Sequence, residues 1–525
     1  KNAELVVNYC NNAKAMVAVP VDAKIDNIGD GVNSTSSEYV PVISSDESVM
    51  IFTYRGDQSV GGLQNAYNQP DPLGVYYEDV FISTKENENW STPRSIGENI
   101  NTAAHDAAIA LSNDGQKLFI FRDNRYDGGD IYMSTLDGIS WSTPEKLRGD
   151  INSAAWEGSC ALSADEKTLY FSSEKPGGMG GKDLYKASLM PDGTWGKVQN
   201  LGNIINTPFD DDAPFIHPDG KTLIYSSKGF NSMGGFDIFK SELNADSSWS
   251  QPVNLGYPIN TPDEDIYFVL SANGKKGYYA SGKKGGFGLQ DIYTVDMPED
   301  FITPILAMLK GTITTDDKPC LADITVYYGI QKLEYASIKS NSLSGDYLIN
   351  LRAGENYTIK YRTDGFEAKE EQLDLTNLRS YLEKDIDVKF YTKKDTIPVA
   401  DSISLVNTST QLASNEGKSI EKSTDIGNSS MVGLEFKVQI AAYNLPKNYR
   451  YEHLRGLGKV EKLLLDDGIT RFTIGGAFNT LNEANAHNQK VRAAGQTDAF
   501  VTAIYNGKRV YLEDLEKLGL IPSQK

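Results

Sequence analysis

Cysteine and long apolar runs are scarce in this 525-residue chain. Its three cysteines, Cys10, Cys160 and Cys320, stand far apart without metal-ligand or redox spacing. We therefore interpret them as buried thiols, which do not indicate the cellular compartment of the protein. The longest apolar runs, such as Phe301–Leu309, fall far below the roughly 18–20 residues that cross a bilayer, so no transmembrane segment is predicted. No signal peptide is visible at Lys1, which we interpret as the start of a mature form or a fragment.

Basic residues are outnumbered, since 51 Lys and Arg stand against 71 Asp and Glu and give a net charge of −20. This balance excludes general binding of nucleic acid or of an anionic membrane surface, because both need clustered Lys and Arg. Residues 431–525 differ, with 13 basic and 10 acidic residues. We therefore expect the C-terminal module to meet a different partner surface from the rest of the chain.

Catalytic signatures are missing as well. The sequence has no Gly-x-Ser-x-Gly elbow, no His-Glu-x-x-His pair and no Gly-x-x-x-x-Gly-Lys-Ser/Thr phosphate loop. The four histidines, His105, His217, His453 and His487, fall in different repeats or elements. We predict that the protein is not an enzyme and uses no cofactor; a glycan-processing activity is the best enzymatic alternative.

What the chain does have is a fixed period. Four of the five tryptophans, Trp90, Trp141, Trp195 and Trp249, are separated by 51, 54 and 54 residues. An acidic-aromatic step precedes each of them and recurs once more, with copies that begin at Asp79, Asp130, Asp183, Asp237 and Asp291. A period near 50 residues is typical of stacked or radially arranged copies of one small unit. It favours binding or positioning over catalysis.

Each copy contains four short strands. In residues 106–149, the turn Asn113–Gln116 joins the first two strands as a hairpin, a loop ending in Gly128-Gly129 leads to the third, and the fourth follows Trp141. Radial packing buries the faces of such sheets and protects their edges. The sequence therefore predicts a mainly β, multidomain protein that begins with a β-propeller of five blades; a sixth, diverged blade is the alternative.

The fifth copy stops near Met297, so we expect Met16–Val21 to supply its outer strand and close the ring, after a helical segment at residues 1–15. The pattern Ser-x-Asp-Gly-Lys-x-Leu-Tyr-Phe-Ser-Ser … Gly-Gly-x-Asp-Ile-Tyr resembles the WD40-like PD40 repeat. The resemblance covers residues 16–300 and recurs five times. It implies the propeller fold and says little about function.

The recurring aspartates and tryptophans are interpreted as structural. We expect each aspartate of the acidic-aromatic steps to bond turn amides of its own blade, and the periodic tryptophans to pack between strands. A calcium site at Asp210–Asp212, or at Asp123, Asp127 and Asp130, is the alternative, but no EF-hand spacing supports it. No metal site is predicted. Trp156 is out of phase and is the tryptophan best suited to a rim.

Residues 305–392 alternate at period two in several short strands, such as Tyr347–Leu351 and Tyr357–Tyr361, which predicts a small β-sandwich. The run Lys-Gly-Thr-Ile … Pro-Cys-Leu-Ala-Asp-Ile-Thr-Val … Gly-Asp-Tyr-Leu-Ile-Asn-Leu resembles the carboxypeptidase regulatory-like domain, which implies no catalytic activity. We interpret this part as a spacer or docking module. Residues 393–430 are rich in Ser, Thr and Asn, which predicts a flexible linker with a reach of about 30–40 Å.

Residues 431–525 alternate strand and helix. The expected elements are strands at Leu434–Ala442, Val460–Leu465, Ile469–Ile474 and Ala499–Tyr505, and helices at Tyr449–Leu457 and Leu481–Ala494. The order βαββαβ is a ferredoxin-like, α+β arrangement. The segments Phe-Lys-Val-Gln-Ile-Ala-Ala-Tyr, Arg-Phe-Thr-Ile-Gly-Gly-Ala-Phe and Val-Arg-Ala-Ala-Gly resemble a SPOR domain. That resemblance implies binding to peptidoglycan, typically to glycan strands stripped of their stem peptides.

Five residues are the predicted peptidoglycan-binding site. The Gln439 amide both donates and accepts hydrogen bonds, and Arg471 and Thr473 share a strand face and add donors. Tyr443 and Phe478 are suited to stack on sugar rings. The alternatives left open are that Gln439 is a solvated strand residue and that both aromatic residues belong to the core. The usual small Gly-Ser after the first strand is Ala441-Ala442 here, and Tyr511–Gly519 adds a helix; either change narrows or blocks the groove.

The domain combination resembles accessory proteins of the Bacteroidota type IX secretion and gliding machinery, which hold outer-membrane components to the cell wall. It implies a periplasmic scaffold whose SPOR domain grips peptidoglycan while the propeller docks outer-membrane or secretion-system proteins. The first alternative is a protein-interaction hub of an outer-membrane complex whose SPOR fold no longer binds glycan. The second is a propeller that binds a soluble carbohydrate.

Overall fold

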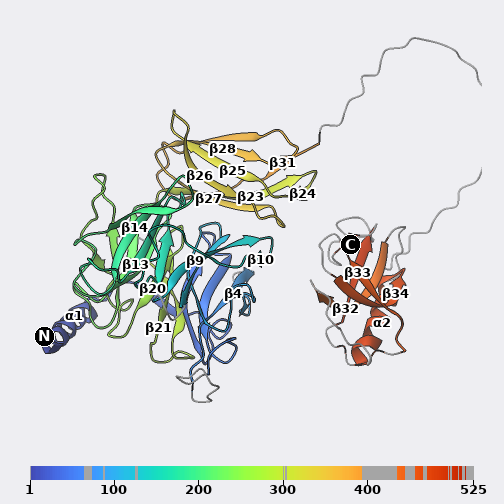
Figure 1. Cartoon of the computed structure of the whole chain (residues 1–525), viewed down its shortest axis with the longest axis horizontal. Coiled ribbons are helices and arrows are strands. Elements are labelled where there is room, and N and C mark those ends of the chain that lie inside the picture. The colour runs from blue at the N-terminus through green and yellow to red at the C-terminus, as the bar shows by residue number, and fades with distance from the viewer. Residues whose placement is uncertain are drawn as a thin grey trace, which may run out of the picture. The chain divides into compact units, whose positions relative to one another are not determined.

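The computed structural model describes residues 2–63, 74–86, 89–123, 128–298, 301, 304–392, 434–443, 454, 456–464, 470–494, 496, 499–505, 508–510 and 515. The described chain is mainly β, as predicted, and divides into two compact units, Lys1–Ile397 and Pro398–Lys525 (Figure 1). The expected linker at residues 393–430 lies outside the described residues. None of the described helices is long and apolar enough to cross a membrane.

Five antiparallel sheets, numbered here in chain order, make up most of the first unit. Each sheet corresponds to one copy of the repeat. Sheet 1 contains β2 (Ser37–Ile43), β3 (Val49–Arg55), β4 (Asp79–Glu86), β5 (Asn89–Trp90) and β6 (Arg94–Ser95). Sheet 2 contains β7 (His105–Leu111), β8 (Lys117–Asp123), β9 (Asp130–Asp137), β10 (Ser140–Trp141) and β11 (Glu145–Lys146). Sheet 3 contains β12 (Ser159–Leu162), β13 (Thr168–Ser173), β14 (Asp183–Leu189) and β15 (Trp195–Asn200). Sheet 4 contains β16 (Asp211–Ile216), β17 (Thr222–Ser227), β18 (Asp237–Glu242) and β19 (Val253–Asn254), and sheet 5 contains β20 (Ile266–Leu270), β21 (Lys276–Ser281), β22 (Asp291–Asp296) and β1 (Lys24–Asn27).

The first strands of the five sheets, β2, β7, β12, β16 and β20, contact one another in a closed ring, which is the arrangement of a β-propeller. β1 pairs with β22 and so joins the start of the repeat region to its end. An N-terminal strand was predicted to close the ring, but the residues were wrong. Met16–Ala18 continue helix α1 (Asn2–Ala18), because no Gly or Pro interrupts the chain before Pro20, and the strand begins only at Lys24.

A hydrogen-bond network repeats at the seams between neighbouring sheets. The Asn206 side chain accepts from Leu184 N (2.7 Å) and donates to Leu184 O (2.9 Å) and Asn200 Oδ1 (2.8 Å). Asn200 Nδ2 in turn donates to Asp183 Oδ2 (3.0 Å). The same roles belong to Asn260, Asn254 and Asp237 at the next seam, and to Asn33, Asn27 and Asp291 at the closing seam. Asp183, Asp237 and Asp291 are therefore structural, as the sequence indicated. Asp79 accepts from Val60 N (2.9 Å), whereas Asp130 Oδ2 lies 2.7 Å from Lys146 Nζ.

Residues 304–392 form two sheets that enclose one apolar core. One sheet contains β23 (Leu306–Thr315), β24 (Lys318–Pro319), β27 (Asp346–Arg352), β30 (Leu382–Asp385) and β31 (Val388–Phe390). The other contains β25 (Asp323–Tyr328), β26 (Leu333–Lys339), β28 (Asn356–Arg362) and β29 (Lys369–Asp374). Tyrosines fill much of the space between the two sheets, including Tyr335, Tyr347, Tyr357 and Tyr361. We call this part the sandwich.

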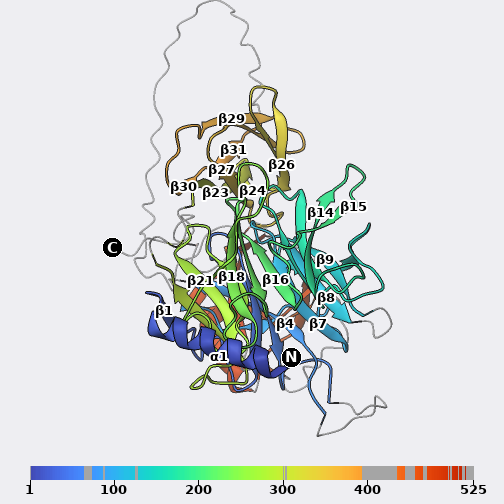
Figure 2. The same cartoon turned by 90° about the vertical axis from the view of Figure 1, so that its left-hand side faces the viewer.

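The sandwich rests on one end of the propeller, where the turns between first and second strands lie (Figures 1 and 2). Asn350 Nδ2 donates to Ser45 Oγ (2.7 Å), and Gln116 Nε2 donates to Lys339 O (2.8 Å). An apolar contact joins the two parts as well, formed by Ala272, Leu306, Met308 and Leu348. Polar and apolar contacts together seat the sandwich on the propeller.

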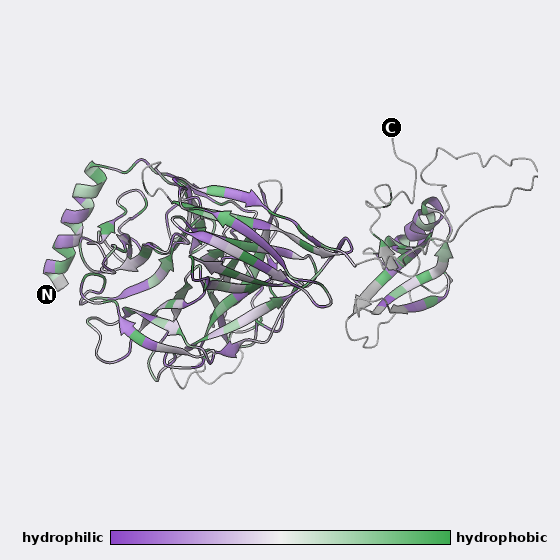
Figure 3. Ribbon diagram, turned by 90° about the horizontal axis from the view of Figure 1, so that it is seen from above, coloured by the Kyte–Doolittle hydropathy of each residue, from purple (hydrophilic) through white to green (hydrophobic). Residues whose placement is uncertain are grey.

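Helix α1 lies across the opposite end of the propeller (Figure 2). Tyr9 Oη donates to Lys228 O (2.9 Å), and Asn12 Nδ2 donates to Ser232 O (2.8 Å). Both carbonyls belong to the loop between β17 and β18, the second and third strands of sheet 4. Loops of an antiparallel sheet alternate between its two ends, so this loop and the turns beneath the sandwich lie at opposite ends. Figure 3 shows hydrophobic and hydrophilic residues interleaved along α1.

The second unit is a five-stranded sheet in the order β33-β34-β32-β35-β36 with helix α2 packed on it. Its elements are β32 (Leu434–Tyr443), β33 (Val460–Leu464), β34 (Thr470–Phe478), α2 (Leu481–Ala493), β35 (Phe500–Tyr505) and β36 (Lys508–Val510). Thr480 and Glu483 form a capping box at the start of α2. The sequence missed β36. Of the expected helices at 449–457 and 511–519, only residues 454, 456, 457 and 515 are described.

Candidate functional site

Three of the five predicted site residues share one face of the sheet in the second unit. Gln439 on β32 lies directly opposite Thr473 on β34, and Arg471 is two residues away from Thr473 on the same strand. Side chains alternate between the two faces of a strand, so Arg471, Thr473 and Gln439 project together. The other face packs against α2 with the apolar core residues Phe436, Val438, Phe472 and Ile474.

Lys437 and Thr502 extend this face, because they lie opposite each other on β32 and β35. We call the five side chains Lys437, Gln439, Arg471, Thr473 and Thr502 the polar face. It is buried: Lys437 is 8% exposed and the other four are 5% exposed or less. Lys437 and Thr502 were not among the predicted site residues, although the alternation of β32 and β35 places both beside Gln439.

One acceptor on the polar face is unused. Gln439 Oε1 has no hydrogen-bond partner among the described residues. Leaving a buried amide oxygen without a donor costs about 1–3 kcal/mol of stability. Because its lone pairs are unused, Gln439 retains the capacity to accept a hydrogen bond from a ligand. At the other end of the face, Lys437 Nζ lies 3.7 Å from Glu435 Oε1 and 3.9 Å from Glu461 Oε2, which keeps this buried cation compensated.

The two predicted aromatic residues do not join the polar face. Phe478 lies opposite the fully buried Phe436, packs against the apolar core and has its ring centroid 5.1 Å from that of His487. The structure thus places Phe478 with the core, the alternative that the sequence left open. Tyr443 ends β32 opposite Thr470, and its side chain lies outside the described residues.

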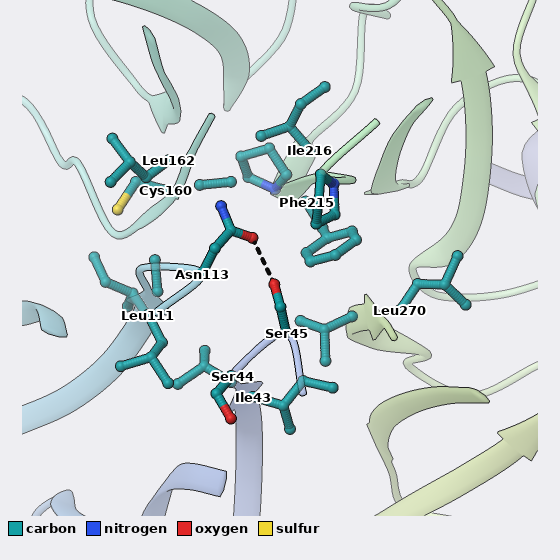
Figure 4. A pocket seen from close by; sticks show the side chains of 17 residues that line it. Ile43, Ser44, Ser45, Leu111, Asn113, Cys160, Leu162, Phe215, Ile216 and Leu270 are labelled. Atoms are coloured by element: carbon teal, nitrogen blue, oxygen red, sulfur yellow. Dashed lines mark hydrogen bonds between the residues drawn. The ribbon is translucent and has the colours of Figure 1, made fainter. Parts of the chain in front are cut away.

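The propeller axis holds a narrow cavity of about 50 Å³ at its sandwich end (Figure 4). Ser45 Oγ donates to Asn113 Oδ1 (3.0 Å) inside a wall of apolar side chains that includes Leu162, Ile216 and Leu270. Asn350 of the sandwich bonds the same Ser45. This space suits one or two waters and is too small for a metabolite.

Two larger hollows, of about 450 Å³ and 470 Å³, lie between the propeller and the sandwich. Asp114, Gln116 and Leu136 line both of them, and the remaining walls mix Ser, Asp and Lys side chains with a larger share of apolar surface. Gln116, which lines both hollows, donates through Nε2 to Lys339 O of the sandwich. We interpret them as gaps beside a structural contact.

The buried ionisable groups of the propeller form hydrogen bonds within its turns and at the seams between its sheets. Burial raises the pKa of Asp211 and Asp237 to about 7, although hydrogen bonds oppose the shift. Burial also opposes ionisation of Asp219, but His217 and backbone amides hold the pKa of Asp219 at about 2. His217 is fully buried and also contacts Ser271 O, so this pair is closed to a substrate. The described residues contain no group of three or more side chains that could hold a metal ion, Asp210–Asp212 included.

No protein-family model matches the sequence, and no curated protein matches it. Solved structures similar to this chain include TolB from Acinetobacter baumannii, 13% identical, covering 50% of this chain and 55% of that one with a TM-score of 0.32. A putative TolB from Agrobacterium tumefaciens is 13% identical and covers 63% and 96%, with a TM-score of 0.31. An endo-arabinase from Bacteroides thetaiotaomicron is 15% identical and covers 51% and 98%, with a TM-score of 0.33. The chain thus spans about half the length of the Acinetobacter protein, and likeness at this level identifies neither activity nor partner.

Proposed function

We propose that the protein is a non-enzymatic periplasmic scaffold that ties an outer-membrane complex of the type IX secretion or gliding kind to peptidoglycan. In this proposal the second unit is a SPOR domain that holds bare glycan strands. The propeller, taken as a five-bladed PD40 propeller, docks protein partners, and residues 305–392, taken as a carboxypeptidase regulatory-like domain, brace it. The domain assignments rest on the sequence resemblances.

The observation that carries the proposal is the unused acceptor of Gln439 within the polar face. Glycan strands present hydroxyl and amide donors at every sugar, and an amide oxygen accepts from either. Arg471 and Thr473 lie beside Gln439 on the same face and are suited to the acetamido and ring oxygens of the same strand. The polar composition of this face supports glycan recognition better than contact with an apolar partner.

Pelleting of the full chain with purified sacculi tests the proposal. Gln439→Leu keeps the size of the side chain and removes only its polar atoms, so the fold is retained. Loss of one hydrogen bond, about 1–1.5 kcal/mol, predicts roughly tenfold weaker pelleting. Gln489→Leu is the matched control, since Gln489 is exposed on α2. If the unaltered chain stays in the supernatant, or if both variants behave alike, the glycan-binding half of the proposal fails.

The burial of the polar face favours a second candidate, a protein-interaction hub whose SPOR fold no longer binds glycan. A face that is at most 8% exposed offers little surface to a sugar strand. For the hub, membrane partners co-purify with the chain after complete lysozyme digestion, and no sacculus binding is measured. Association that disappears with lysozyme supports the scaffold instead.

A further inference from the structure

Equivalent loops join the second and third strands of sheets 3, 4 and 5, at the propeller end that carries α1. They span residues 174–182, 228–236 and 282–290. Each contains an apolar residue four positions before the recurring aspartate, namely Met179, Met233 and Phe287. The backbone N–H of this residue donates to the aspartate in all three loops, at 2.5, 3.0 and 2.6 Å.

The following glycine confirms that the three loops have the same geometry. A Cβ added at Gly180 would lie 1.8 Å from Phe209 O, one at Gly234 would lie 2.1 Å from Pro262 O, and one at Gly288 would lie 1.8 Å from Ser36 O. Each loop is therefore pressed against the backbone that leads into the neighbouring sheet. Such a loop is a firm, preformed platform, because no side chain separates the two backbones.

One of the three loops is occupied by a helix. α1 crosses the sheet 4 loop and bonds its main chain through Tyr9 and Asn12, at Lys228 O and Ser232 O. Met233, which directly follows Ser232, is only 2% exposed. Its counterparts Met179 and Phe287 are 43% and 48% exposed, and Leu289 beside Phe287 is 81% exposed. The apolar residue is thus buried in the loop that a helix crosses and exposed in the other two.

We propose that the loops 174–182 and 282–290 are docking sites for amphipathic helices of a partner protein, equivalent to the seat of α1 on loop 228–236. This inference rests on the proposed function, because it names the propeller face and the kind of partner that the scaffold docks. α1 shows how such a helix binds, because its side chains donate to main-chain carbonyls of the loop. This contact does not depend on the side chains of the loop. The equivalent acceptors are the carbonyls of Glu174 and Gly178 in one loop and of Gly282 and Gly286 in the other.

The partner chemistry follows from the half-buried face of α1, which contains Leu5, Tyr9, Asn12 and Met16. A fitting helix places apolar side chains over Met179 or Phe287, and it places Tyr or Asn donors three residues apart over the carbonyls. Helices that dock in this way present their contacts at i, i+3, i+4 and i+7. The sandwich covers the other end of the propeller, so the loop end is the face left for such partners.

A synthetic peptide with the sequence of residues 2–18, carrying Cys10→Ser, is the probe. The tethered α1 holds its own seat at high effective concentration, so free peptide has the other two loops to bind. Saturable binding to the full chain is expected, with slower amide exchange at 174–182 and 282–290. Met179→Asp and Phe287→Asp should each weaken binding at their own loop about tenfold and reduce the protection of that loop, while the other loop binds the peptide and is protected as before. Ile330→Asp changes an equally apolar residue, fully exposed on the sandwich, and should leave binding unchanged.

Absence of saturable binding overturns the inference, as does protection confined to 228–236 or an equal loss with Ile330→Asp. Sacculus pelleting of the same preparations separates the two proposals. If pelleting fails while the peptide binds as expected, the wall-anchoring function is wrong and the docking sites stand. If pelleting succeeds while the peptide does not bind, only the docking sites are wrong.

Discussion

Replacing Asn206 with alanine should destabilise the propeller more than any exposed substitution, because this side chain ties the seam between sheets 3 and 4. Asn206 is 1% exposed, and it satisfies both the N–H and the C=O of Leu184, which is itself fully buried. It also donates to Asn200. Asn206→Ala therefore removes three hydrogen bonds and leaves the buried N–H of Leu184 without a partner, whereas the C=O of Leu184 still accepts from Leu201 N (3.0 Å).

The expected loss follows from that N–H and from the other two hydrogen bonds. A buried N–H left unsatisfied costs about 1–3 kcal/mol, each of the other two hydrogen bonds contributes about 0.5–1.5 kcal/mol, and water that enters the space of the deleted amide recovers part of the total. We expect Asn206→Ala to lower the free energy of unfolding by about 2–4 kcal/mol. That is a large share of the roughly 5–15 kcal/mol by which a domain is stable.

Urea unfolding followed by tryptophan fluorescence measures this loss cleanly, because all five tryptophans lie between Trp90 and Trp249 and report only on the propeller. Asn231→Ala is the matched control: Asn231 is exposed, and its bond to Asn254 of the seam uses its backbone carbonyl, which the substitution keeps. We expect the control to stay within about 0.5 kcal/mol of the unaltered chain. A loss below about 1 kcal/mol for Asn206→Ala, or equal losses for both variants, would refute the seam as a main source of stability.

Three further outcomes are expected. Burial raises the pKa of Asp237 from 3.8 to about 7, so between these pH values the folded state binds more protons than the unfolded state. The propeller therefore loses stability as the pH rises from 3.8 to about 7. Asp237→Asn should flatten this part of the plot of urea midpoint against pH. Despite its burial, the pKa of Asp219 lies at about 2, so its contribution is present above 3.8 and is lost as pH falls toward 2; Asp219→Asn should destabilise the protein at neutral pH, and an unchanged midpoint would contradict this. Tyr9→Ala combined with Asn12→Ala should speed amide exchange in the loop 228–236 by releasing α1, whereas no change there would show that α1 does not hold it.

Local sequence patterns predicted the repeat and the sheets that it forms. They did not predict contacts between segments that lie far apart in the chain. Asp183 and Trp195 carry the period because every sheet needs the same seam and the same packing, so one copy predicts the next. Met16–Ala18 were placed in a strand because three apolar residues fit a strand and a helix equally well. The contact of Asn350 with Ser45 joins residues 305 positions apart, and neither side chain carries a signal that names the other.

The polar face shows the same limit. Alternation along β32 and β34 placed Gln439, Arg471 and Thr473 on one face, because period two depends only on the strand. Their burial was not predictable, since it depends on what packs over the sheet rather than on the strand itself. Phe478 has the composition of a sugar-stacking residue, yet the register that sets it opposite Phe436 turns it to the core.

Recurrence within the repeat separates two roles. The aspartates Asp183, Asp237 and Asp291 recur because each closes a loop and a seam inside the propeller. The apolar residue four positions earlier also recurs, but the propeller does not bury it: Met179 and Phe287 remain exposed, and only Met233 is covered. An apolar side chain with no packing role inside the ring gains from burial only through an outside contact. Met233, the buried residue, lies in the loop that α1 crosses. The repeat that closes the ring therefore also provides equivalent binding sites for helices on neighbouring sheets.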